Sequence, residues 1–117
     1  MADLPPLRNS GINDDDVEKA LDYLRDTAET CAETRAARVY LEEYRKSLKA
    51  ILMKDHTDLA VNAQEREAYA HPDYVKHLAA MRVAVFEDEK GRFLRHAAEA
   101  KIEAWRTQES TRRSMKL

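Results

Sequence analysis

Apolar residues recur at alternating steps of four and three over much of the chain before Lys54. Two runs carry this spacing: Val17, Leu21, Leu24, Ala28, Cys31, and then Ala37, Leu41, Tyr44, Leu48, Ile51. The spacing is typical of a helix that packs an apolar seam against a partner helix. Two consecutive steps of three join the runs through Thr34, so we expect a bend or a change of partner near residues 32–37.

The first helix is expected to begin at Asn13 and to end near residue 54 or 55. Asn13 is a good N-cap, and three aspartates follow it in the first turn, where the helix dipole favours anions. No Gly or Pro lies between Gly11 and Pro72. A helix of about 40 residues would span roughly 60 Å.

Residues 54–62 mix polar residues with isolated apolar ones, which predicts a turn or loop. Asn62 followed three residues later by Glu65 matches a capping box, so we expect a short helix over residues 63–69. Pro72 should end that helix, because proline disfavours helix in the residue before it. It is also well placed as the first residue of the next helix.

The last helix is expected to run from Pro72 to about residue 108–112, with a bend at Gly91. A stripe at helical spacing predicts its packing face. The stripe consists of Tyr74, Val75, Leu78, Ala79, Val83, Phe86, Phe93, Ala97, Ala100 and Ala104, widened by Leu94, Ala98, Ile102 and Trp105. We expect most of the aromatic residues to lie in the core.

The predicted fold is all-α, with two long helices in an antiparallel coiled-coil-like hairpin and a short connecting helix. Residues 1–12 are expected to form a flexible arm and residues 13–117 a single domain. Eight acidic residues in 13–33 would face eight basic residues in 90–117. A helix pair leaves apolar surface uncovered, so we expect a homo-oligomer, most simply a dimer.

Composition excludes several classes of protein. The 117 residues carry a net charge of −2, with 36% charged residues and only two Gly and three Pro, which favours long solvated helices. The charge balance gives no strong attraction for nucleic acid or anionic lipid. One cysteine, no signal-like N-terminus and no apolar run long enough for a membrane span predict a cytoplasmic protein.

No pattern predicts a catalytic, metal or cofactor site. His56, His71, His77 and His96 lack the spacing of paired helical ligands, although His71 and His77 with Glu65 or Asp73 are one alternative. Cys31 lies between acidic residues that oppose thiolate formation. The paired carboxylates lack a cleft that could shift their pKa values, so an enzyme is the least favoured class.

The C-terminal half of the chain resembles small helical proteins of bacteriophages and prophages. The segments that carry the resemblance are AQEREAYA (63–70), PDY (72–74) and AKIEAWRTQESTRR (100–113). Members of this uncharacterised family are often encoded near single-strand annealing or replication proteins. The resemblance implies an accessory role in DNA recombination or replication in the bacterial host.

Two segments are candidates for contact with a partner protein or with nucleic acid. Their residues are Gln64, Arg66 and Tyr69 near the connecting helix, and Trp105, Arg106, Gln108, Arg112 and Arg113 near the C-terminus. The basic residues and Trp105 would allow weak contact with single-stranded DNA. The favoured interpretation is that these charges complement the acidic first helix and that Trp105 is core.

The leading functional hypothesis is therefore a non-enzymatic phage accessory protein that acts through protein contacts. The alternative is a structural, self-assembling component of a virion or an assembly scaffold.

Overall fold

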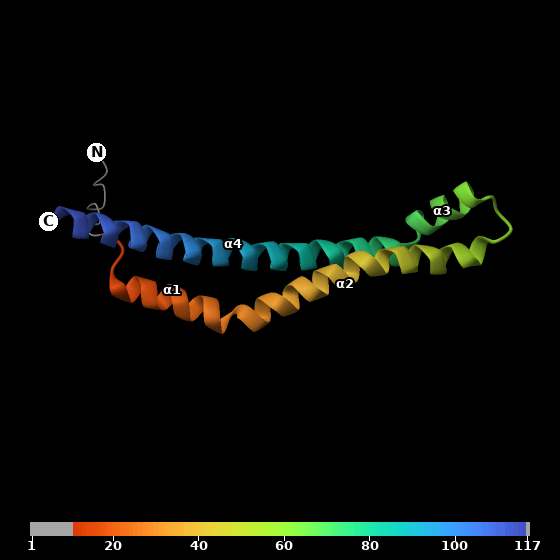
Figure 1. The fold of residues 1–117 in the computed structure, drawn as a ribbon. Helices are drawn as coiled ribbons and strands as arrows, with labels where there is room; N and C mark the ends of the chain where they lie inside the picture. The colour runs from red at the N-terminus through yellow and green to blue at the C-terminus, as the bar shows by residue number, and fades with distance from the viewer. Residues whose placement is uncertain (1–10, 117) are drawn as a thin grey trace, which may run out of the picture. The chain divides into compact units, whose positions relative to one another are not determined.

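The computed structural model describes residues 11–116, and these residues are helical apart from short connections (Figure 1). The elements are α1 (Asp14–Asp26), α2 (Ala28–Met53), the short 3-10 helix η1 (Lys54–His56), α3 (Val61–Ala70) and α4 (Pro72–Met115). No strand occurs in this range, which confirms the all-α prediction. The arm expected over residues 1–12 lies almost wholly outside the described residues.

The chain divides into two compact units. The first unit contains Met1–Ala28 and Arg92–Leu117, and therefore α1 and the C-terminal part of α4. The second unit, Glu29–Gly91, contains nearly all of α2 together with η1, α3 and the beginning of α4. The single domain expected over 13–117 stays a prediction.

The start of α1 is as predicted. The Asn13 side chain accepts a hydrogen bond from the backbone N–H of Asp16 at 2.8 Å, and the Asp16 carboxylate accepts one from the N–H of Asn13 at 3.1 Å. This reciprocal capping box satisfies two N–H groups at the helix end. The local sequence alone is sufficient to fix this boundary.

The predicted unbroken helix from Asn13 to residue 54 is wrong, because α1 ends before Thr27 and α2 begins after it. The Thr27 hydroxyl donates to the carbonyl of Tyr23 at 2.6 Å, a bond that competes with regular helical geometry. Arg95 of α4 donates to the Leu24 carbonyl at 2.9 Å and to the Thr27 hydroxyl at 3.1 Å. A cation at this position also complements the negative end of the α1 dipole.

Helix α2 passes through residues 32–37 without interruption, and the bend or change of partner expected there stays a prediction. Several residues of α2 that face α4 or the core cluster in the second unit are separated by steps of seven, three, seven and four: Cys31, Arg38, Leu41, Leu48 and Leu52. This is a regular seven-residue repeat. The apparent irregularity arose because a polar residue, Arg38, occupies a seam position that the apolar pattern assigned to Ala37.

The connecting helix α3 contains the predicted residues 63–69 but begins earlier, at Val61. The predicted capping box of Asn62 and Glu65 is wrong: Ala60 is the N-cap and no side chain caps the helix. Instead, Gln64 donates from its side-chain amide to the carbonyl of Leu59 at 2.8 Å. His71, in an extended conformation, ends α3, and Pro72 starts α4 as predicted.

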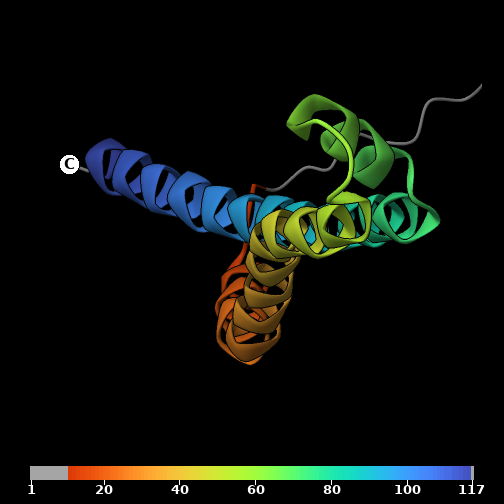
Figure 2. The ribbon, with the colours of Figure 1, turned by 90° about the vertical axis from the view of Figure 1, so that its right-hand side faces the viewer.

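A small apolar core holds α3 against α2 and α4 in the second unit (Figures 1 and 2). It consists of Leu48, Leu52, Ala68 and Tyr74, with Met53 packed against it. Ala68 is fully buried, so any larger side chain at this position would meet neighbouring atoms.

The last helix, α4, extends to Met115, a few residues beyond the predicted end, and is helical on both sides of Gly91. A Cβ atom on Gly91 would lie 3.4 Å from the Sγ of Cys31. The glycine therefore allows close approach of α2 to α4 in the second unit.

Candidate functional site

The apolar stripe predicted as the packing face of α4 is mostly exposed. Val75, Val83 and Phe86 are 55%, 62% and 63% exposed, and Leu78 and Phe93 are exposed as well. The prediction that this stripe forms the core is therefore wrong for these residues. A helix in a soluble protein normally turns its most apolar face inward, so this exposed stripe is a candidate interaction surface.

The face of α4 that packs within the second unit carries polar residues as well as apolar ones such as Tyr74. His77 is only 8% exposed, and its Nε2 donates to the carbonyl of Leu41 at 2.6 Å. Asp88 accepts a hydrogen bond from the Arg38 guanidinium at 3.2 Å. Sequence analysis missed these residues because a search for apolar spacing passes over a polar residue at a seam position.

Arg38 is the centre of a partly buried ion-pair cluster in the second unit. Its guanidinium lies 2.8 Å from Glu42 and from Glu89 in addition to its contact with Asp88. The hydrogen bond with Glu42, followed by those with Glu89 and Asp88, raises the pKa of Arg38 above its usual value. Two of these three carboxylates belong to α4, so the cluster links α2 to α4 in the second unit.

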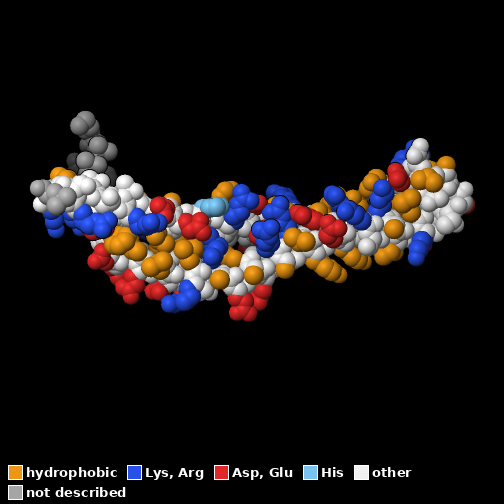
Figure 3. Space-filling model, in the orientation of Figure 1, with side chains coloured by type: hydrophobic (Ala, Val, Ile, Leu, Met, Phe, Trp, Pro, Cys, Tyr) orange, Lys and Arg blue, Asp and Glu red, His pale blue; other side chains and the backbone are white. Residues whose placement is uncertain are grey.

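A second exposed apolar stripe lies on α2. Tyr40 is 66% exposed, and its ring stacks on that of Tyr44 with centroids 6.0 Å apart. Ile51, on the same side of the helix, is also exposed. On the face drawn in Figure 3, hydrophobic side chains reach the surface along the edge of α2 and over α1. Most aromatic residues are therefore outside the core, contrary to the prediction.

The three candidate residues near the connecting helix have different roles. Gln64 closes the turn before α3, as described above, whereas Arg66 is exposed. The ring of Tyr69 packs edge-on against that of Tyr74, with centroids 5.2 Å apart. The ammonium of Lys49 lies 4.9 Å from the Tyr69 ring centroid. Arg66 is therefore exposed, Tyr69 is exposed but contacts Tyr74 and Lys49, and Gln64 bonds the backbone of its own chain.

The C-terminal candidates lie in the first unit, where two of them bind the N-terminal side of α1. The half-buried Trp105 donates from its indole N–H to Asp14 at 3.2 Å. Gln108 donates to the carbonyl of Ile12 at 2.7 Å and accepts from its N–H at 2.9 Å. These two side chains therefore join the C-terminal part of α4 to the start of α1 within the first unit.

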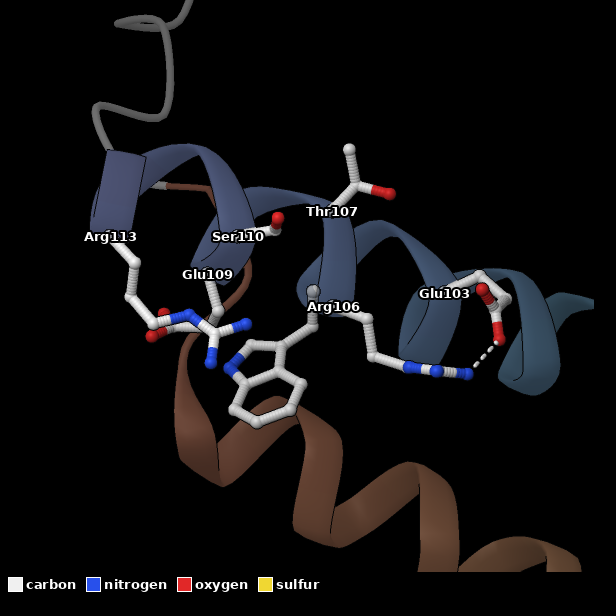
Figure 4. A pocket seen from close by; sticks show the side chains of 7 residues that line it. Glu103, Arg106, Thr107, Glu109, Ser110 and Arg113 are labelled. Atoms are coloured by element: carbon white, nitrogen blue, oxygen red, sulfur yellow. Dashed lines mark hydrogen bonds and ion pairs between the residues drawn. The ribbon is translucent and has the colours of Figure 1, made fainter. Parts of the chain in front are cut away.

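The basic candidates pair with glutamates of their own helix. Arg106 lies 2.9 Å from Glu103, and Arg112 lies 2.9 Å from Glu109. Figure 4 shows Arg106 turned toward Glu103 beside an open depression that Arg113 also lines. Arg112 also lines a depression together with Asp14 and Asp15, and the expectation that these arginines complement the acids of the first helix stays a prediction. The mixed charges do not make a basic groove.

Among residues 11–116, no group of three His, Cys, Asp or Glu side chains is placed to hold a metal ion. No helix in that range combines the length and apolar character of a membrane span. Cys31 is a free, half-buried thiol.

Comparisons with protein-family models, curated proteins and solved structures found no match to this chain.

Proposed function

We propose that this chain is a non-enzymatic protein that acts by binding other proteins through the outer faces of its helices. The observation that carries the proposal is the placement of apolar and polar side chains on α4 in the second unit. Apolar Val83 and Phe86 face solvent, while polar His77 packs inside. Exposed apolar helix faces of this kind are typical of protein interaction sites.

The biological setting that we propose is an accessory role in phage or prophage DNA recombination or replication, in the cytoplasm of the bacterial host. This part of the proposal rests on the resemblance of residues 63–74 and 100–113 to small phage proteins. The partner would be a phage recombination or replication protein, and the chain itself would be a homo-oligomer.

The fold that we propose for the whole chain is an antiparallel coiled-coil-like hairpin, in which α4 returns along α2 and α1. Contacts within each unit support it, because the residue number rises on one helix as it falls on the other. The pairs are Asp14 with Trp105 and Leu24 with Arg95 in the first unit, and Arg38 with Asp88 and Tyr44 with His77 in the second.

A role without catalysis is supported by the use of the polar side chains in the seam. His77 binds a backbone carbonyl, and Arg38 binds three carboxylates. These contacts hold helices together, whereas a catalytic group needs a free position beside a reacting atom. We therefore assign His77 and Arg38 to the packing of α2 against α4.

Protein contact is favoured over DNA contact by the state of the basic side chains. Phosphate binding requires lysine or arginine charge that is not already neutralised. Arg106 and Arg112 are paired with glutamates, and the Trp105 indole is bonded to Asp14. Contact with single-stranded DNA is secondary in this proposal, and exposed Arg113 would be its main contributor.

The test is co-expression with the single-strand annealing or replication protein encoded in the same phage or prophage, followed by affinity capture. Wild type should retain that protein, and a Tyr40→Ser/Phe86→Ser variant should retain less of it. Lys46→Ser, a change at an exposed polar position on α2, is the matched control. Absence of any complex would overturn the accessory role, and assembly into large homo-oligomers would favour a structural component.

A further inference from the structure

In the second unit, the side of α4 that faces away from α2 is apolar and exposed. We call it the outer α4 face and define it by Val75, Leu78, Ala79, Val83 and Phe86. Four of these are exposed large hydrophobic residues. Their spacing of three or four residues places them along one side of a helix with 3.6 residues per turn.

The packing of the second unit leaves this face unused. The residues of α4 that meet the core cluster or α2 include Tyr74, His77, Asp88, Glu89 and Gly91. At about 100° per residue, all of these except Glu89 lie on the side of α4 opposite to Phe86. The outer α4 face therefore needs a partner other than α2.

We propose that the outer α4 face binds the same face of a second copy of this chain, with the two α4 helices antiparallel. This inference names the first partner of the interaction protein proposed above and rests on that proposal. In a two-fold dimer each copy contributes the same patch, so the patch must be complementary to itself.

The charges beside the face supply this self-complementarity. Lys76 and Glu87 are eleven residues apart, or about three helical turns, so they lie on the same flank of the face. Both are exposed, and neither forms an ion pair with another residue of the 11–116 range. Antiparallel pairing places Lys76 of each copy opposite Glu87 of the other, because a two-fold axis perpendicular to the helices keeps the same flank of both copies together. Parallel pairing would put the two flanks on opposite sides of the interface, where Lys76 and Glu87 could not pair.

The apolar side chains are arranged in the same way. Val75 lies near one end of the face and Phe86 near the other, with small Ala79 between them. Reversing the second copy therefore packs Phe86 against the end that carries Val75. Parallel packing would instead place the two Phe86 rings side by side and leave only the smaller Val75 side chains in contact at the other end.

Arg82 lies near the middle of the face, so the two-fold axis brings the Arg82 side chains of the two copies close together. Their aliphatic stems can cover apolar surface while the guanidinium groups reach water. Replacement of Arg82 by leucine should therefore tighten the dimer, because it removes the like-charge contact and adds apolar surface.

Sedimentation equilibrium over a range of protein concentrations tests the surface. Wild type should be a dimer, and Val83→Ser/Phe86→Ser should raise the Kd of dimerisation by roughly tenfold or more. Tyr40→Ser is the matched control, because Tyr40 is an equally exposed aromatic residue on α2. Circular dichroism establishes that each variant keeps its helices.

Charge reversal tests the antiparallel orientation. Lys76→Glu and Glu87→Lys should each weaken the dimer, and the double variant should restore the wild-type Kd. A wild-type chain that stays monomeric, or a dimer that Tyr40→Ser weakens and Val83→Ser/Phe86→Ser does not, would overturn the inference. If a monomeric chain captures a phage protein, the proposed function stands and the dimer inference falls. If the chain forms the dimer but captures no phage protein, the dimer inference stands and the proposed function falls.

Discussion

Gln108 pairs its side-chain amide with both backbone groups of Ile12. The amide oxygen accepts from the Ile12 N–H at 2.9 Å, and the amide nitrogen donates to the Ile12 carbonyl at 2.7 Å. The glutamine thus acts on Ile12 as a neighbouring strand would. Gly11 permits this, because a Cβ atom on residue 11 would overlap the Gln108 amide oxygen.

Gly11→Ala should displace the Gln108 amide and release the backbone of Ile12. The two hydrogen bonds together contribute on the order of 1–3 kcal/mol to the stability of this end of the first unit. Hydrogen exchange at the Ile12 amide, measured by NMR, should become faster. Gln108→Glu should have a smaller effect, since it keeps the acceptor and loses only the donor, and Thr107→Ala should have none. Unchanged exchange in Gly11→Ala would contradict the pairing.

Neighbouring residues at the end of α2 test the packing register. Leu52 is 6% exposed within the core cluster, whereas Ile51 is 49% exposed. Leu52→Ala should lower the free energy of unfolding by about 2–4 kcal/mol, and Ile51→Ala by less than about 1.5 kcal/mol. Urea denaturation measures both values. Equal losses would mean that the apolar pattern, which assigned Ile51 to the seam, identifies the packing face correctly.

The Arg38 cluster should contribute more to stability than an exposed ion pair of the same composition. Arg38→Gln leaves Asp88 and Glu89 close together without their shared cation, and both are partly buried. Arg25→Gln is the control, because Arg25 contacts two carboxylates at the surface, whereas Arg38 contacts three. The melting temperature should fall clearly in the first variant and little in the second. A larger fall for Arg25→Gln would show that the cluster does not hold the seam.

Lys49 should make the stability of the second unit depend on alkaline pH. Its pKa is raised above 10.5, first through its interaction with the Tyr69 side chain and then through Glu65, 3.3 Å away. A folded-state pKa above the unfolded value means that the contribution is complete below pH 10.5 and is lost as pH rises through the folded pKa. The difference in urea midpoint between wild type and Lys49→Met should therefore shrink above pH 10.5.

Glu65→Gln supplies the comparison for this pH effect. It removes one cause of the raised pKa and leaves the Tyr69 contact in place. The Lys49 contribution should then be smaller, and its loss should be complete at a lower pH than in the wild type. A difference between wild type and Lys49→Met that does not change with pH would contradict the assignment.

The sequence was sufficient for boundaries that depend on adjacent residues. The capping box at Asn13 and Asp16 and the end of α3 before Pro72 involve groups within a few positions of each other. The type of fold followed in the same way, because few Gly or Pro residues interrupt the helical spacing. Among the candidate site residues, Arg66 and Tyr69 are exposed, and their contact with a partner stays a prediction.

Only the tertiary structure decided where the first helix breaks and which face of each helix is buried. The break at Thr27 includes a contact with Arg95, which is 68 positions away. The buried face of α4 carries His77 and Asp88 because α2 offers a carbonyl and Arg38 to satisfy them. A pattern of apolar residues contains no information about such distant partners, so it selected the stripe that the structure leaves exposed.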